Sequence, residues 1–136
     1  RKTKNNMAIT PLKITEDGTV GAVGTCTPGG DEFANSGVEF IRITNNHASV
    51  GYTVTIAAQT ANFYLPRYGK LTKSSVSASV TNGNTVFLGP FRPSVFNDAS
   101  EKVQVTYKVT SNDAAISTIS SGAHLLKIEV LYLEQK

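Results

Sequence analysis

Two histidines and a single cysteine are the side chains of this sequence best suited to metal binding or nucleophilic catalysis. With a nearby carboxylate, His47, His124 and Cys26 would in principle form a metal site or a Cys–His nucleophile. No short ligand pair such as Cys-x-x-Cys or His-x-x-x-His supports that arrangement. His47 falls in a turn-forming segment, His124 begins a strand-like segment, and no cation stands beside Cys26 in the sequence. We therefore expect structural or solvated roles for all three residues, and neither a metal nor a cofactor.

Acidic residues occur as two adjacent pairs, Glu16-Asp17 and Asp31-Glu32, which are candidates for calcium binding or general acid–base catalysis. A calcium loop requires a spaced series of oxygen ligands rather than one adjacent pair. The glycine-rich stretches Gly21–Gly24 and Pro28–Gly30 lack the Gly-Lys-Ser/Thr ending of a phosphate-binding loop. No nucleophile, base and orienting group are visible together, so we expect the protein not to be an enzyme. A small hydrolase on a jelly-roll scaffold is the weakest alternative.

Segment 62–70 interleaves aromatic and basic side chains. Its aromatic residues are Phe63, Tyr64 and Tyr68, and they lie close to Arg67. Such a mixture suits nucleobase stacking, a sugar-binding platform or a protein interface. Alternatively, two of the aromatic rings plug one end of the fold while the cations face water. We take Phe63, Tyr64, Arg67 and Tyr68 as candidate protein-interface residues.

The net charge of +3 originates in the first six residues. Three of the 13 basic side chains, Arg1, Lys2 and Lys4, lie there, and the other ten are balanced by 10 acidic side chains. A nucleic-acid partner is not expected, because such binding usually needs basic residues clustered on one face. No apolar run approaches the roughly 18 residues that span a bilayer, and no secretory signal pattern precedes Met7, so no membrane partner is expected either.

The elements that position these candidates are predicted to be short β-strands. The predicted strands are Val38–Thr44, Gly51–Ala57, Val76–Val80, Thr85–Leu88, Lys102–Val109 and Ala123–Leu133, with Ala114–Ser120 either a strand or a short helix. The first two flank the turn-forming residues 45–47, and we expect them to pair. The third and fourth flank the Asn82-Gly83 step, which suits a tight hairpin.

Loops are predicted between these strands. Residues 15–37 are rich in Gly, Thr and acidic side chains and are expected to form loops with one short strand. Residues 60–75 are expected to form a long loop across one end of the fold. About eight short strands with regular turns predict an all-β, single-domain antiparallel β-sandwich or jelly roll. We expect residues 15–136 to form this domain, and residues 1–14 to form an N-terminal arm or tail that includes at most one edge strand.

One stretch of the sequence resembles a known family. It runs through Gly89-Pro-Phe-Arg-Pro-Ser-Val-Phe-Asn-Asp98 and Val103-Gln-Val-Thr-Tyr107, preceded by Asn35-Ser-Gly37. Over roughly residues 35–107 the chain resembles the head decoration and auxiliary proteins of tailed bacteriophages, which are small β-sandwich proteins of the virion. The resemblance implies a structural turn motif in which Gly89 and Pro90 set a turn, Phe91 and Phe96 anchor it in the core, and Asn97 and Asp98 begin the next turn.

The resemblance also implies a function. It implies a structural virion protein that binds the outside of a phage capsid, with the major capsid protein as partner, and cements neighbouring capsid subunits. Its location would be the capsid surface, and the host cytoplasm during assembly. A homo-oligomer, with a trimer favoured, would touch several subunits at once. The arm would offer Ile9 and Leu12 as apolar anchors, unless it is only a terminus with one edge strand.

A second function remains open. The chain would then be a receptor- or carbohydrate-binding module of a phage tail or fibre. Tyr64 and Tyr68 would form the platform on which the receptor or sugar binds.

Overall fold

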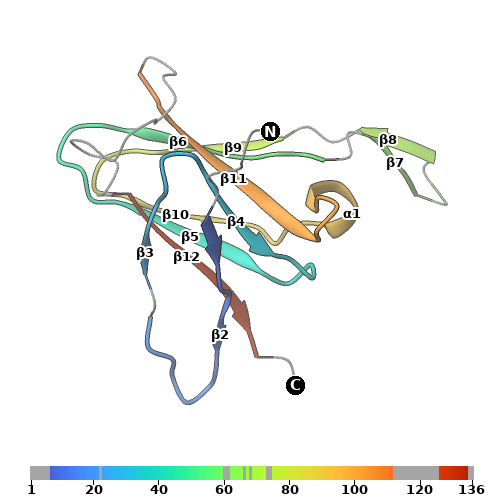
Figure 1. Ribbon diagram of the computed structural model, residues 1–136, viewed down its shortest axis with the longest axis horizontal. Coiled ribbons are helices and arrows are strands. Elements are labelled where there is room, and N and C mark those ends of the chain that lie inside the picture. Colours follow the sequence, from blue (N-terminus) through green and yellow to red (C-terminus); the bar gives the residue numbers. More distant parts are fainter. Residues whose placement is uncertain are drawn as a thin grey trace.

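The computed structural model describes residues 7–21, 23–59, 62–65, 67, 69–72, 75–111 and 126–134, which fold as two β-sheets packed face to face (Figure 1). The β11 sheet contains, in order, β1 (Met7–Ile9), β4 (Asp31–Ala34), β11 (Lys102–Val109), β6 (Tyr52–Ile56) and β9 (Val76–Val80). The β12 sheet contains β10 (Thr85–Leu88), β5 (Phe40–Asn45), β12 (Leu126–Leu133) and β2 (Leu12–Ile14), with β3 (Gly24–Thr25) also paired to β12. The predicted all-β sandwich is confirmed.

The core lies between the two sheets, because each long strand turns its apolar residues inward. In β5 and β6 buried and partly exposed residues alternate, as expected for strands with one face on the core. The fully buried apolar side chains include Phe33, Ile41, Ile43, Val54, Ile56, Val80, Val103, Val105 and Leu126. Their burial removes apolar surface from water and is the main favourable term in folding.

The N-terminal strands make both sheets mixed rather than purely antiparallel. Met7 lies opposite Asp31 in the parallel pair of β1 and β4, and Leu12 lies opposite Leu131 in the parallel pair of β2 and β12. These two parallel pairs are an addition to the antiparallel sandwich expected from the sequence. Pro11, which has no backbone N–H, stands between the two short strands. Residues 7–14, set apart as an arm from the sequence, therefore supply one edge strand to each sheet.

Two predicted strand pairings are wrong. β5 pairs with β10 and β12, whereas β6 pairs with β9 and β11, so the strands that flank residues 45–47 lie in different sheets. The strands β9 and β10, expected to form a hairpin, also belong to different sheets. Each turn is an arch between the sheets, and the two arches bind each other. The N–H of Asn45 donates to the carbonyl of Asn84 (2.9 Å), and the N–H of Gly83 donates to the carbonyl of Asn45 (2.8 Å).

The predicted loops contain more structure than their composition suggested. Residues 15–37 hold β3 and β4 instead of one short strand. Residues 60–75 contain β7 (Asn62–Leu65) and β8 (Gly69–Thr72), which pair with each other in a separate two-stranded sheet. A four-residue helix, α1 (Pro93–Phe96), follows the Gly-Pro-Phe turn. Residues 114–120, expected to form a strand or a short helix, lie outside the described residues.

The part of the chain that the structure describes holds no helix capable of crossing a membrane.

Candidate functional site

The β7–β8 hairpin carries most of the residues predicted to contact a protein. Phe63 and Tyr64 lie in β7, opposite Leu71 and Lys70 of β8. Arg67 lies at the tip between the strands and is exposed, whereas Tyr68 lies outside the described residues. In Figure 1 the hairpin stands at the right-hand end of the molecule, beyond the strands of both sheets. The exposed Arg67 is therefore presented at one end of the molecule.

The two apolar anchors predicted in the N-terminal arm belong to the sandwich itself. Ile9 lies opposite Phe33 in the β1–β4 pair and packs against the core. Leu12 lies opposite Leu131 and is half-buried. Their contacts stabilise the edges of the fold, and they lie far along the chain from the aromatic hairpin.

The Gly-Pro-Phe turn is built into the core. Gly89 has a φ of 115°, and a Cβ atom there would lie 3.1 Å from the Cα of Phe40, so only glycine fits without strain. Its peptide bond to the exposed Pro90 is cis. Phe91 and Phe96 are buried, and their rings meet edge to face with centroids 5.6 Å apart. The turn and α1 thus each place one aromatic ring in the core.

A reciprocal amide pair joins this turn to the Asn-Ser-Gly segment. Asn35 Nδ2 donates to Asn97 Oδ1 (2.7 Å) and to the carbonyl of Phe91 (3.0 Å). Asn97 Nδ2 donates back to the carbonyl of Asn35 (2.9 Å), and Asn35 Oδ1 accepts the N–H of Gly37 (3.1 Å). The buried Asn35 thereby connects the first part of the sequence resemblance with the segment 89–98.

Asp98 begins the following turn and organises a polar network on the outer face of the β11 sheet. Its Oδ1 accepts the backbone N–H groups of Ser100 (2.8 Å) and Lys102 (3.0 Å). Its Oδ2 accepts Gln104 Nε2 (2.8 Å), which also donates to Glu32 Oε1 (3.0 Å). Lys102 Nζ forms an ion pair with Glu32 Oε2 at 3.2 Å. These contacts hold the start of β11 against β4.

The second acidic pair is divided between the two faces of β4. Asp31 points into the core, where its carboxylate accepts the Tyr107 hydroxyl and the N–H of Thr27. Glu32 points outward to the Lys102 ion pair. The first pair, Glu16 and Asp17, lies on the loop after β2 and does not join them. The two acidic pairs therefore form no common site.

Cys26 lies beside Asp31 and Tyr107 in the core and is unsuited to nucleophilic chemistry. Burial raises the pKa of its thiol to about 12; the Tyr107 hydrogen bond lowers it, and the Asp31 charge raises it. Burial also raises the pKa of the Tyr107 hydroxyl well above its ordinary value. A nucleophilic cysteine requires the opposite shift, which stabilises the thiolate.

His47 has a structural role in the arch between β5 and β6. Its Nδ1 accepts the backbone N–H groups of Ser49 and Val50, both at 3.1 Å. Its ring meets Tyr52 edge-on, with centroids 6.3 Å apart. His124 lies outside the described residues. Among the described residues, no three His, Cys, Asp or Glu side chains gather in a way that could hold a metal ion.

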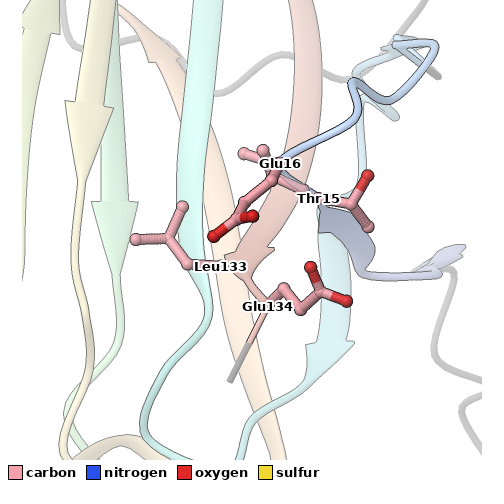
Figure 2. Close-up of a pocket in the computed structure, with 5 residues that line it drawn as sticks. Thr15, Glu16, Leu133 and Glu134 are labelled. Carbon is pink, nitrogen blue, oxygen red and sulfur yellow. The ribbon is translucent and has the colours of Figure 1, made fainter. Parts of the chain in front are cut away.

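One surface feature was not predicted from the sequence. The end of β12 and the loop after β2 enclose a shallow hollow of about 260 Å³ (Figure 2). Ile14, Thr15, Glu16, Leu133 and Glu134 line it. The sequence holds no signal for this hollow, because it depends on the parallel pairing of β2 with β12, which joins the two ends of the chain.

Comparisons of the chain with protein-family models, with curated proteins and with solved structures gave no significant match.

Proposed function

We propose that the protein is a non-enzymatic structural protein of a phage virion, which binds the outside of the capsid and cements neighbouring major capsid subunits. The observation that carries this proposal is the β7–β8 hairpin, which pairs with neither large sheet and stands beyond the end of the sandwich (Figure 1). Its sequence combines aromatic residues with arginine, the residue types enriched at protein interfaces.

The buried polar groups support a structural role rather than a catalytic one. Asn35, Asp31 and Asn45 each bind neighbouring protein groups, and no buried side-chain nitrogen or oxygen among the described residues is without a hydrogen-bond partner. A group poised for catalysis usually retains bonding capacity for its substrate. Here that capacity is used to hold turns and strands together.

The sequence resemblance to phage head decoration proteins supports the choice of partner. Two of the segments that carry the resemblance, Asn35–Gly37 and residues 89–98, meet through the Asn35–Asn97 pair. A symmetric oligomer, with a trimer favoured, would present several hairpins at once and gain effective concentration with each further contact.

Co-sedimentation with assembled capsids, and separately with tails, tests the proposal. We expect binding to capsids, and a loss of about tenfold in affinity for Arg67→Glu, because interface arginines are frequent hot spots. Lys13→Glu changes the charge equally at an exposed position of β2 and is expected to bind like the wild type. Binding to tails but not to capsids would overturn the proposal, as would equal losses for both variants.

A receptor- or carbohydrate-binding module of a phage tail or fibre is the second candidate. The density of aromatic residues in the same hairpin favours it, because flat rings suit both sugar faces and protein receptors. A glycan array and a host-cell pull-down, each repeated with Tyr68→Ala, distinguish this function from capsid binding. Retention of glycans by the wild type and their loss in the variant would favour this second function.

A further inference from the structure

The hollow at the end of β12 combines an apolar floor with an acidic rim. Ile14 and Leu133 supply the apolar surface, and Leu133 is 58% exposed. Figure 2 shows the Glu16 carboxylate beside Leu133, with Glu134 at the end of β12. Backbone bonding holds the two walls together, since the N–H of Glu134 donates to the carbonyl of Ile14 (2.9 Å). The two segments that line the hollow are therefore held side by side by a backbone hydrogen bond.

A lysine or arginine side chain matches this combination better than a purely apolar one. Its methylene stem can lie along Ile14 and Leu133 while its charged end meets the carboxylates. The chain itself contains a segment of this chemistry: Arg1, Lys2 and Lys4 lie in the six residues before β1. Because the other charges of the chain are balanced, these residues carry its entire basic excess.

We propose that this hollow binds the basic N-terminal segment, residues 1–6, of a second copy of the chain. Six extended residues reach at most about 20 Å from Met7. The hollow of the same copy lies at the far end of the eight-residue stretch 7–14, which runs from the edge of one sheet to the edge of the other. A segment bound within its own copy would have to run back along this longer stretch. The geometry therefore favours a neighbouring copy.

The resulting contact is head to tail, because each copy donates its basic segment at one place and accepts another at a different place. Contacts of this kind close into rings when the rotation between copies allows it. In a ring of three copies, every hollow would hold the basic segment of a neighbouring copy. This self-association does not depend on a capsid as the partner, and it is tested without one.

Molar mass measured by light scattering across protein concentrations and at low and high salt tests the proposal. We expect the wild-type chain to oligomerise at low salt and to dissociate at high salt, because the contacts are surface ion pairs. Glu134→Lys is expected to raise the dissociation constant at least tenfold. Glu101→Lys makes the same charge change at an exposed position outside the hollow and is expected to behave like the wild type.

A mixing experiment tests the pairing directly. One variant carries Glu16→Lys and Glu134→Lys, and the other carries Arg1→Glu, Lys2→Glu and Lys4→Glu. Each alone is expected to be a monomer with unchanged circular dichroism, and their mixture is expected to associate again, because each segment then meets a hollow of opposite charge on the other variant. The two variants must alternate, so the mixture is expected to form open chains or even-numbered rings rather than a ring of three. A wild type that stays monomeric at all concentrations would overturn the proposal. An oligomer insensitive to both sets of reversals, or variants that do not recover on mixing, would overturn it too.

Discussion

Asn35 and Asn97 lie 62 residues apart in the chain and bind each other in both directions. The side-chain amide of Asn35 donates to the side-chain oxygen of Asn97 at 2.7 Å, and the amide of Asn97 donates to the backbone carbonyl of Asn35 at 2.9 Å. The pair joins the end of β4 to the residue after α1. Since Asn35 also donates to the carbonyl of Phe91, it fixes the turn that holds the aromatic rings in the core.

Replacing Asn35 with alanine should destabilise the protein strongly. The change leaves the carbonyl of Phe91, the N–H of Gly37 and one side of the Asn97 amide without their partners. Leaving buried polar groups unbonded costs free energy, and we expect a loss of about 3 kcal/mol in the free energy of unfolding. Urea unfolding of the wild type and of Asn35→Ala at neutral pH measures this loss in the free energy of unfolding.

Asn46→Ala provides the matched control for this experiment. Asn46 is exposed in the arch after β5, and its replacement should change the free energy of unfolding by less than about 0.5 kcal/mol. Similar small effects at both positions would show that the Asn35–Asn97 pair does not hold the turn.

Stability should fall in alkaline solution because of Cys26. Burial raises the pKa of its thiol from 9.0 to about 12, so between these values the folded state holds the proton more tightly than the unfolded state. The contribution is complete below about pH 9 and is lost as the pH rises towards 12, at about 1.4 kcal/mol per pH unit. The raised pKa of Tyr107 acts in the same direction at higher pH.

Cys26→Ala isolates this contribution. The variant should show a shallower decline of unfolding free energy between pH 9 and 11 than the wild type, although it loses some packing at all pH values. Urea unfolding at several pH values measures both slopes. Identical slopes in the two proteins would show that the Cys26 thiol does not cause the loss of stability at alkaline pH.

The sequence was sufficient to predict where most strands lie but not which strands pair. The alternation in β6 and β11 is visible directly, because apolar residues recur at every second position. The turns at 45–47 and 82–83 contain residue types that favour β-hairpins. Each nevertheless connects a strand of one sheet to a strand of the other. Inward and outward residues alternate identically in both arrangements, so local periodicity cannot distinguish a hairpin from an arch.

The polar interior was the least predictable part. β4 was missed because Asp31 occupies an inward position that strand patterns reserve for apolar residues. Its hydrogen bonds with the Tyr107 hydroxyl, distant in sequence, and with the N–H of Thr27 make that position favourable. The burial of Phe91 and Phe96 was expected from the sequence resemblance. The partner that holds their turn, Asn35, was named only as part of a segment, since nothing local indicates its bond to Asn97.

The thiol of Cys26 should resist modification in the folded protein. The residue is only 3% exposed, and its raised pKa leaves almost no thiolate at pH 8. Labelling with a disulfide reagent should therefore proceed at the rate at which the protein opens or unfolds. The control is a double variant, Cys26→Ala/Ser94→Cys, whose single thiol lies at an exposed position of α1. This thiol should react within seconds. Equal labelling rates would show that Cys26 is accessible.

Asn45 joins the two arches, and its amide group is required at that position. Its side chain is completely buried, and its Nδ2 donates to the carbonyls of Val50 (2.8 Å) and Val80 (3.0 Å). Its Oδ1 accepts the N–H of His47 at 2.9 Å. One amide thus connects the turn after β5 with the end of β9.

Asn45→Asp tests this role with almost no change of shape. At pH 7 an aspartate cannot donate to either carbonyl and places a charge in the core, so we expect a loss of at least about 3 kcal/mol in unfolding free energy. The loss relative to the wild type should shrink below pH 4, because a protonated carboxyl can donate one hydrogen bond. Asn46→Asp, at an exposed position of the arch after β5, controls for the added charge and should cost less than about 1 kcal/mol. If the two variants lose equal stability at pH 7, the bonds of Asn45 do not hold the arches together.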